Sequence, residues 1–342
     1  MMEKIKLTQF SKGAGCGCKI APAVLEELLQ SDNAYPADKK LIVGNESSDD
    51  AAVYDLGDGN YLISTTDFFT PVVNDPETFG KIAAANAISD VYAMGGKPIL
   101  ALAVLGWPVE KIPVEEAKKV LNGARVVCSE AGIVLAGGHS IDSPEPVFGL
   151  CVNGLIKAGH LKRNNTAKPG DLIFITKPIG TGILTTAEKR GILKPEHEGI
   201  AAAEMMKLNK AGEELGKLSF VHAMTDITGF GLLGHLTEMA KGSGLSAEIN
   251  YSNVPVMPAA KEYAAQFVYP DNTMRNWSYY EKTTEGIGAE SLLTLCDPQT
   301  NGGLMIAADE QKADELKKML AKEELFLIGK FVSKKEKLVY IL

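Results

Sequence analysis

The sequence predicts an α/β (α+β) protein made of two mixed α/β domains. Its 342 residues exceed the size at which a single hydrophobic core usually stops growing, so two domains are expected. Strand-like and helix-like segments are mixed in both halves of the chain. The polar stretch Gly159–Pro169 separates these halves. We therefore predict an N-terminal domain over residues 1–158 and a C-terminal α/β domain over residues 159–342.

In the first half, a β-hairpin is the clearest element. The strand-like runs Ala51–Leu56 and Tyr61–Thr66 flank Gly57-Asp58-Gly59-Asn60, and an Asp-Gly pair is typical of tight hairpin turns. Apolar periodicity and terminal glycines predict the other elements. These are helices over Ile20–Gln30, Glu77–Met94 and Val114–Ala131, and strands over Ile99–Leu105, Ile133–Ala136 and Phe148–Lys157.

The second half shows the same mixture of elements. The turn Lys177–Gly182 leads into a helix, and Asn272–Glu290 is weakly patterned, which predicts an irregular surface excursion. Strand-like approaches end in Thr66-Asp67 and again in Thr225-Asp226, a weak sign of duplication. The remaining elements are helices over Gly199–Leu215 and Leu232–Lys241, and strands over Asp171–Thr176, Ala247–Tyr251, Leu304–Ala307, Leu325–Phe331 and Lys337–Leu342.

Composition excludes several classes of protein. The net charge of −8 argues against general binding of nucleic acid and suits a protein that collects carboxylates around cations. The longest apolar stretch, Ile99–Trp107, is too short to cross a bilayer, and no signal peptide is visible. The five cysteines are too few and too scattered for a disulfide framework or a closed zinc site. We expect a cytoplasmic enzyme or binding protein that uses neither nucleic acid nor a membrane.

The motif Cys16-Gly17-Cys18-Lys19 is the most informative feature of the chain. A lysine close to a thiol favours the nucleophilic thiolate, and the nearby glycines let the backbone fold closely around a ligand. A soft nucleophile beside a phosphate-pairing cation indicates sulfur or selenium chemistry near a phosphoryl group. Taken alone, the motif is equally compatible with a flexible N-terminus that carries two ordinary cysteines.

Acidic residues form the second group of candidates. Asp49-Asp50 precede the first strand of the hairpin, and Asp67 ends its partner strand. Asn86 and Asp90 share one helix face at i, i+4 spacing, and Asp226 lies in a tight loop before a helix. Carboxylates on loops and strand ends are the usual ligands of Mg²⁺ in the presence of a phosphate ligand. Each alone is also compatible with a helix cap, a turn residue or a solvated acid.

Glycine-bounded loops form the third group. Gly137-Gly138-His139-Ser140 follows a strand, Gly180-Thr181-Gly182 precedes a helix, and Gly302-Gly303 follows a polar segment. The first two are expected to present backbone N–H groups to phosphate, although each is also compatible with a plain turn. None has the spacing of a P-loop or of a dinucleotide-binding fingerprint.

Taken together, these segments resemble the selenophosphate synthetase (selenide, water dikinase) family. The Cys-Gly-Cys-Lys motif is specific to that family, whereas the acidic loops are shared with the wider aminoimidazole ribonucleotide synthetase-like superfamily, which includes thiamine monophosphate kinase. The likeness runs over essentially the whole chain. The segments that carry it are Leu7–Lys19, Val43–Asp55, Ile63–Phe68, Asn86–Pro98, Leu135–Pro146, Ala223–His235 and Cys296–Leu304.

The resemblance implies that ATP, selenide and water become selenophosphate, AMP and phosphate, which supplies the selenium donor for selenocysteine and selenouridine synthesis. It implies Mg²⁺ as cofactor, with K⁺ as an optional activator. It also implies a homodimer in which N-terminal domains pair into a β-barrel. Independently of the resemblance, Gly13, Gly15 and Gly17 predict that the N-terminal segment with the Cys/Lys motif is mobile. The further partners that the resemblance implies are selenide itself or a selenium-delivery protein.

The family pattern also assigns roles to individual residues. Cys16 occupies the position held by cysteine or selenocysteine, and Lys19 is the essential lysine beside it, close to ATP. The magnesium positions are Asp50, Asp90 and Asp226. The positions that contact ATP are Ser47, Ser48, Asp49, Asp67, Asp90, Gly138, His139 and Ser140.

Two other interpretations remain open at this stage. One is another ATP-dependent synthetase or kinase of the same superfamily, which would release ADP rather than AMP. The other is a non-catalytic thiol or selenium carrier that uses Cys16 and Cys18 and turns over no nucleotide.

Overall fold

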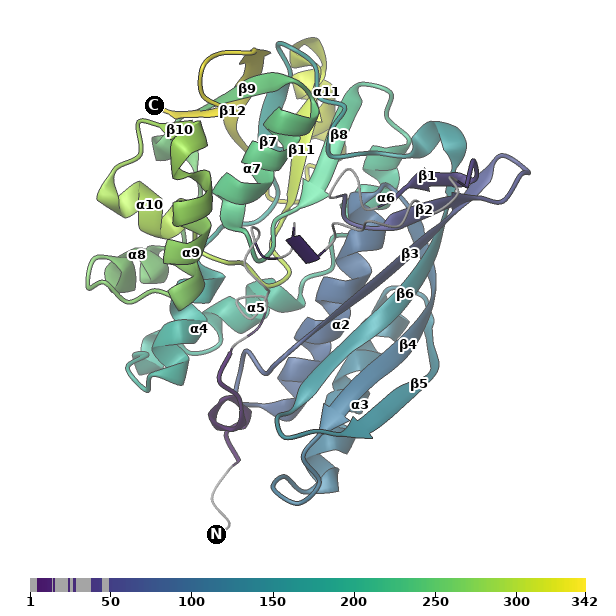
Figure 1. The fold of residues 1–342 in the computed structure, drawn as a ribbon, viewed down its shortest axis with the longest axis vertical. Helices are drawn as coiled ribbons and strands as arrows, with labels where there is room; N and C mark the ends of the chain where they lie inside the picture. Colours follow the sequence, from purple (N-terminus) through teal and green to yellow (C-terminus); the bar gives the residue numbers. More distant parts are fainter. Residues whose placement is uncertain (1–4, 14, 16–23, 25–26, 29–37, 45–48) are drawn as a thin grey trace.

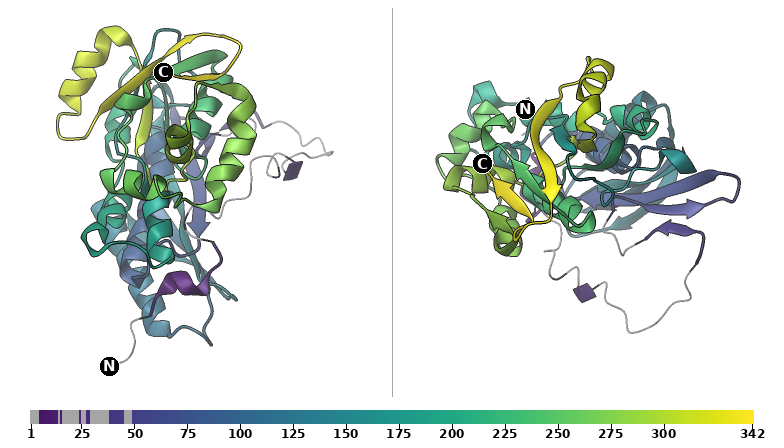
Figure 2. Two further views of the ribbon diagram at one scale, coloured as in Figure 1. Left: turned by 90° about the vertical axis from the view of Figure 1, so that its left-hand side faces the viewer. Right: turned by 90° about the horizontal axis from the view of Figure 1, so that it is seen from above.

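A computed structural model gives the fold, and it describes residues 5–13, 15, 24, 27–28, 38–44 and 49–342. The two domains lie side by side, with a blue-purple N-terminal sheet on one side and green and yellow C-terminal elements on the other (Figures 1 and 2). This arrangement confirms the predicted α/β class. Within the described part of the chain, no helix combines the length and the apolar character needed to cross a membrane.

The N-terminal domain is a six-stranded sheet with two helices packed on one face. The strand order is β1-β2-β3-β6-β4-β5, and β4–β5 is its one parallel pair among the described strands. The strands are β1 (Leu41–Val43), β2 (Ala52–Asp55), β3 (Asn60–Phe69), β4 (Lys97–Trp107), β5 (Val134–Asp142) and β6 (Val147–Lys157). The helices are α2 (Pro76–Ala93) and α3 (Val114–Glu130).

Helices α2 and α3 pack unusually closely because each contributes a glycine to their contact. A Cβ atom on Gly80 would lie 1.9 Å from the Val120 carbonyl oxygen, and one on Gly123 would lie 2.1 Å from that of Glu77. Neither position therefore accommodates a side chain without moving the helices apart. Helix α2 begins at the N-cap Asp75, whose carboxylate accepts from the Thr78 N–H.

The C-terminal domain is a seven-stranded mixed sheet with the order β10-β13-β9-β12-β7-β11-β8. Its strands are β7 (Leu172–Ile175), β8 (Val221–Asp226), β9 (Leu245–Ile249), β10 (Thr284–Glu285), β11 (Leu304–Ala308), β12 (Phe326–Ser333) and β13 (Val339–Ile341). Its helices are α4 (Thr181–Lys189), α5 (Ile200–Met206), α6 (Ala211–Gly216), α7 (Gly231–Gly242), α8 (Pro258–Ala264), α9 (Asp271–Tyr280), α10 (Ala289–Leu295) and α11 (Ala313–Met319).

Helix α2 joins the two domains. It contacts the N-terminal sheet and α3, and also α5, α6 and β8 of the C-terminal domain. This position explains why nearly every residue of α2 is buried, including the polar Asn86, Ser89 and Asp90. Buried polar side chains require hydrogen-bond partners, so this helix is where the domains exchange polar contacts.

Most predicted elements are confirmed, including the hairpin, in which Asp55 pairs with Tyr61. Three expectations about elements were wrong, and a fourth is not tested by the described residues. The single helix over Gly199–Leu215 is two helices, α5 and α6, separated by residues 207–210. The strand that begins at Ile133 does not end at Ala136, because β5 continues to Asp142. The helix over Ile20–Gln30 lies largely outside the described residues.

The third error concerns Asn272–Glu290, which is not an irregular excursion. It contains α9, whose Asn272, Thr273 and Asn276 are buried. The Asn276 amide donates to the carbonyl oxygens of Gly229 and Cys296, 3.0 and 3.1 Å away. The segment lacks an apolar stripe because polar side chains make its contacts with the core.

Candidate active site

Three aspartates from different elements approach one another where the two domains meet. Asp50 lies two residues before the start of β2, Asp90 lies in the last turn of α2, and Asp226 ends β8. The pKa of Asp50 is raised well above its ordinary value, first by burial and then by the negative charges of Asp226, Asp49 and Asp90. These carboxylates therefore form one acidic cluster, although they come from positions 176 residues apart.

Each carboxylate of the cluster accepts a hydrogen bond from a neighbouring hydroxyl group. Thr225 Oγ1 donates to Asp50 Oδ1 at 2.7 Å. Thr65 Oγ1 donates to Asp90 Oδ2, and Ser89 Oγ donates to Asp226 Oδ2, both at 2.5 Å. Hydroxyl groups orient the carboxylates without neutralising them, so the cluster keeps its demand for positive charge.

The donor set of this cluster fits Mg²⁺. One oxygen each of Asp49 and Asp50 is buried without a hydrogen-bond partner, and such an oxygen is costly unless a cation or donor meets it. Burial raises the pKa of Asp49 to about 6, against opposing hydrogen bonds from the backbone of Asn164 and Asp50. Among the residues that the structure describes, no three His, Cys, Asp or Glu side chains are arranged so that they could hold a metal ion by themselves. Hard oxygen ligands completed by phosphate oxygens are how Mg²⁺ is usually bound.

The side-chain amide of Asn86 connects Asp67 to helix α2. The Asn86 Nδ2 atom donates to Asp67 Oδ2 at 2.5 Å, and the Asn86 Oδ1 atom accepts from the backbone N–H of Asn301 at 2.7 Å. Asn86 therefore links a strand of the N-terminal sheet to a loop of the C-terminal domain. Because Asn86 lies one helical turn from Asp90, Asp67 belongs to the same neighbourhood as the acidic cluster.

The structure brings only some of the predicted residues together. It gathers Asp49, Asp50, Asp67, Asp90 and Asp226 at the domain junction. The remaining predicted site residues outside the glycine loop, Cys16, Lys19, Ser47 and Ser48, lie outside the described residues.

The Gly138-His139-Ser140 segment does not join the acidic cluster within one chain. It lies inside β5, where it pairs in parallel with Ala103, Val104 and Leu105 of β4. Four strand spacings, about 19 Å, separate β5 from β2 across the sheet. The segment is therefore part of a strand rather than the loop that was expected, while its contact with ATP stays a prediction. A Cβ atom on Gly138 would lie 2.1 Å from the Ala103 carbonyl oxygen.

The turn before α4 is also not a phosphate site. Its N–H groups are taken by side chains of the loop over residues 297–303. Gln299 Oε1 accepts from the N–H groups of Gly180 and Thr181 at 3.0 and 3.1 Å, and Asp297 Oδ2 accepts from that of Gly182 at 3.1 Å. This turn is a capped helix start whose partner is protein rather than ligand.

The chain that leads to the Cys/Lys motif is anchored by both domains. Leu7 is fully buried, and Lys189 Nζ of α4 donates to the carbonyl oxygens of Ser11, Lys12 and Gly13 at 2.9, 2.9 and 2.7 Å. The backbone N–H of Gly15 donates to the Thr70 carbonyl oxygen at 3.1 Å. The described part of the segment that was expected to be mobile is therefore docked, and its motif lies outside the described residues.

Comparisons with known proteins place the chain. Residues 48–156 match the family model "AIR synthase related protein, N-terminal domain", and residues 168–341 match "AIR synthase related protein, C-terminal domain". Among solved structures, thiamine-monophosphate kinase from Stenotrophomonas maltophilia is similar, with a TM-score of 0.65 at 18% identity over 95% of this chain and 96% of that one. The hydrogenase maturation protein HypE in complex with ATP is also similar, with a TM-score of 0.63 at 18% identity over 95% of this chain and 87% of that one. These likenesses establish the fold.

Curated relatives are far more similar in sequence. A selenide, water dikinase from Photorhabdus laumondii is 53% identical over 93% of this chain and 91% of its own length. The selenide, water dikinase of Escherichia coli K12 is 52% identical over 96% of this chain and 95% of its own length. The chain belongs to the selenide, water dikinase family.

In this member of the selenide, water dikinase family, sequence reasoning identified the acids but missed the groups that hold them. Thr65, Ser89 and Thr225 each donate to a carboxylate of the acidic cluster. Asn209 and Asn301 donate to Ser89 and Asn86 of helix α2. The i, i+3 spacing of Asn86 and Ser89 in an otherwise apolar helix was the available signal. The polar residues of the C-terminal domain gave no comparable signal, because their partners are more than a hundred residues away.

Proposed function

We propose that this chain is a selenophosphate synthetase that converts ATP, selenide and water to selenophosphate, AMP and phosphate. The observation that carries the proposal is the cluster of Asp50, Asp90 and Asp226 at the domain junction of a chain about half identical to curated selenide, water dikinases. The product is an activated selenium donor for selenocysteine and selenouridine synthesis.

Asp50, Asp90 and Asp226 hold Mg²⁺, and K⁺ serves as an activator. When bound, Mg²⁺ neutralises the charge of the triphosphate and of the phosphoryl group in transfer. The hydroxyl groups of Thr225, Thr65 and Ser89 orient the three carboxylates before nucleotide arrives, so little reorganisation is needed. Asp49 and Asp67, together with Ser47 and Ser48, contact the nucleotide. This division of roles rests on the residues of this chain and on their match to the family pattern.

Cys16 and Lys19 perform the chemistry nearest to selenium. Lys19 favours the thiolate of Cys16 and offers a point charge to phosphate oxygens. The thiolate orients the selenide nucleophile without a covalent bond to it, and the transferred phosphoryl group needs positioning rather than a covalent bond to the enzyme. The residues Ser11–Gly13, which precede the motif in the sequence, are held by Lys189 of the C-terminal domain.

The experiment that tests the proposal is an assay of nucleotide products with and without selenide. A selenophosphate synthetase forms AMP and phosphate in a selenide-dependent manner. Formation of ADP would instead indicate another ATP-dependent synthetase or kinase of the superfamily. Absence of nucleotide turnover together with binding of soft metal ions would indicate a thiol carrier.

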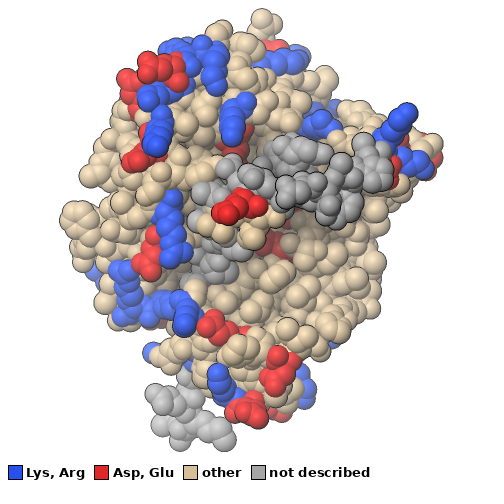
Figure 3. Space-filling model, in the orientation of Figure 1, with Lys and Arg blue, Asp and Glu red and all other residues tan. Residues whose placement is uncertain are grey.

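We also propose that two copies pair through the open face of the N-terminal sheet, which lies opposite α2 and α3. Exposed apolar side chains on this sheet include Phe68, Ile99, Leu102 and Leu155. The surface over β3, β6 and β4 is largely free of charged side chains (Figure 3). A contiguous uncharged apolar face of this kind marks an interaction surface. Pairing also offers a way to bring Gly138, His139 and Ser140 near a nucleotide held by the other copy.

Analytical ultracentrifugation tests the dimer. Leu155→Glu places a charge on this face and is expected to convert the protein to monomer at micromolar concentration, whereas Val126→Glu on the exposed side of α3 is expected to leave the dimer intact. Identical sedimentation of both variants and the unmodified protein as monomers would contradict the pairing.

We place the enzyme in the cytoplasm, where its five cysteines stay reduced. Its further partner is selenide or a selenium-delivery protein, and it has no role for nucleic acid or membrane.

A further inference from the structure

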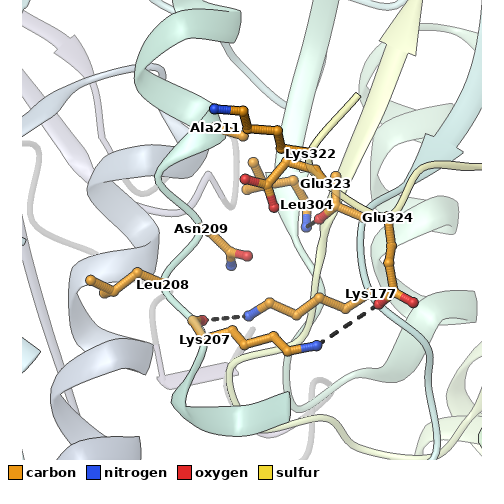
Figure 4. Close-up of a pocket in the computed structure, with 10 residues that line it drawn as sticks. Lys177, Lys207, Leu208, Asn209, Ala211, Leu304, Lys322, Glu323 and Glu324 are labelled. Atoms are coloured by element: carbon orange, nitrogen blue, oxygen red, sulfur yellow. Dashed lines mark hydrogen bonds and ion pairs between the residues drawn. The ribbon is translucent and has the colours of Figure 1, made fainter. Parts of the chain in front are cut away.

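A cavity of about 270 Å³ in the C-terminal domain is lined by residues that include Lys177, Asn209 and Leu304 (Figure 4). Leu304 pairs with Asp226 of the acidic cluster across the sheet. Lys177, which follows β7, enters the wall of the cavity and is only 5% exposed. Its ammonium donates to the carbonyl oxygens of Lys207 at 2.7 Å and Asn301 at 3.0 Å. Burial lowers the pKa of Lys177 to about 7, with the charges of Asp226 and Glu204 opposing that shift. The proposed chemistry gives this buried lysine no part.

Lys177 and Asn301 together fix one short piece of backbone. The Asn301 Nδ2 atom donates to the carbonyl oxygens of Met205 at 2.6 Å and Lys207 at 2.9 Å. The Lys207 carbonyl therefore accepts from both side chains. Asn301 has a φ of 49°, in the left-handed region that few residues other than glycine and asparagine adopt. A backbone in this conformation persists only when its surroundings determine it.

The fixed backbone contacts the acidic site by two routes. In the first, the Asn301 N–H donates to Asn86, whose amide donates to Asp67. In the second, Asn209 Nδ2 donates to the Gly302 carbonyl oxygen at 2.9 Å and to Ser89 Oγ at 2.7 Å, and Ser89 donates to Asp226. Asn86 and Ser89 lie three residues apart in α2, so both routes meet the same helix face.

We propose that Lys177 is a positioning residue for the nucleotide site, which acts by holding the Asn301 backbone so that Asn86 and Asp67 are correctly placed. Among the described residues, Lys177 makes no hydrogen bond to a predicted nucleotide or metal residue, and its hydrogen bonds reach the site through Asn301. Its charge also interacts with that of Asp226. Removing the ammonium leaves the buried Asn301 carbonyl without this donor, and relaxation of the backbone at Asn301 moves the N–H group from which Asn86 accepts. This inference deepens the proposed function and rests on it.

The test compares Lys177→Met with Lys207→Met in the full-length protein. Lys207 lines the same cavity, but its network contact is made by its carbonyl, which the substitution keeps, while its side chain pairs with Glu204 and Glu324. Affinity for a non-hydrolysable ATP analogue with Mg²⁺ is measured by calorimetry. We expect Lys177→Met to weaken it by about tenfold and Lys207→Met by less than about twofold. In turnover, Lys177→Met is expected to raise KM for ATP more than it lowers kcat.

A double-mutant cycle separates positioning from a purely structural role. Because Lys177 acts through Asn86, the double variant Lys177→Met/Asn86→Ala is expected to bind the analogue no more weakly than Asn86→Ala alone. Multiplying effects, or unchanged analogue affinity in a folded Lys177→Met protein, would overturn the proposal. The binding measurement does not depend on selenide, so failure of the proposed reaction would appear separately, as a lack of selenide-dependent AMP formation by the unmodified protein.

Discussion

The anchor made by Lys189 gives the most direct prediction about the N-terminal segment. Lys189→Met keeps the aliphatic stem but removes the ammonium that donates to the carbonyl oxygens of Ser11, Lys12 and Gly13. Without it, three consecutive peptide carbonyls lose a shared donor, and the contact between α4 and the N-terminal segment loses its polar part. Leu7 remains buried, so the segment is expected to open locally rather than to detach.

The size of the effect follows from these contacts. A hydrogen bond from a charged donor contributes about 1.5–3 kcal/mol net when it is buried. Lys189 is only partly buried, and water replaces part of each contact, so about 1–2 kcal/mol for all three together is a reasonable total. That free energy corresponds to a roughly 5- to 30-fold increase in the open population of the segment.

Hydrogen exchange of the backbone amides over residues 5–13 measures this opening. We expect about tenfold faster exchange in Lys189→Met, with lower selenide-dependent turnover and nearly unchanged affinity for the ATP analogue with Mg²⁺. Arg190→Met is the matched control, because Arg190 follows on the same chain and donates to the distant Tyr269 carbonyl instead. Equal exchange over residues 5–13 in Lys189→Met and the unmodified protein would refute the anchor.

Three further predictions concern separate features. Burial raises the pKa of Asp297 to about 8, so the folded protein keeps a proton that the unfolded chain releases near 3.8. The contribution of that proton to the free energy of unfolding is complete below the unfolded-state pKa and is lost as the pH rises through the folded-state pKa. Urea unfolding should therefore give a shallower fall in stability between pH 4 and 8 for Asp297→Asn, and parallel curves would contradict this. Gly182→Ala places a Cβ 2.3 Å from the Pro298 carbonyl oxygen, so we expect a loss of about 2 kcal/mol or more in the same assay, and unchanged stability would argue against the close packing. Cys16→Ser should abolish selenophosphate formation while ATP binding is kept, and Cys18→Ser should be milder; wild-type activity in Cys16→Ser would rule out its proposed role.

Local sequence patterns predicted most of the N-terminal domain because its elements carry clear local signals. The Asp-Gly turn marks the hairpin, and glycines mark the end of α2. The patterns failed where distant contacts decide. The Gly137-Gly138 pair predicted a loop, yet β5 continues through it because those glycines allow close approach to β4. In α9, buried asparagines replace the apolar stripe that would have indicated a helix.

The candidate site divides in the same way. Carboxylates at strand ends and on a helix face indicated Asp50, Asp90 and Asp226, although nothing in their spacing required that they meet. Their meeting depends on the docking of α2 against β8, which is a property of the folded chain. Asn301 and Lys177 were not predicted, because a buried amide and a buried ammonium that serve backbone carbonyls leave no local signature.

The central claim is that the acidic cluster at the domain junction holds Mg²⁺ with the nucleotide. The measurement that tests it most directly is the apparent Mg²⁺ affinity of the complex with a non-hydrolysable ATP analogue, for Asp226→Asn beside Asp314→Asn. Asp226 is buried in the acidic cluster, whereas the side chain of Asp314 is 91% exposed on α11. Because Asp226→Asn removes one ligand charge, we expect its apparent Mg²⁺ affinity to be at least about tenfold weaker, whereas that of Asp314→Asn is expected to be unchanged. The same Mg²⁺ dependence in both variants and in the unmodified protein would contradict the claim.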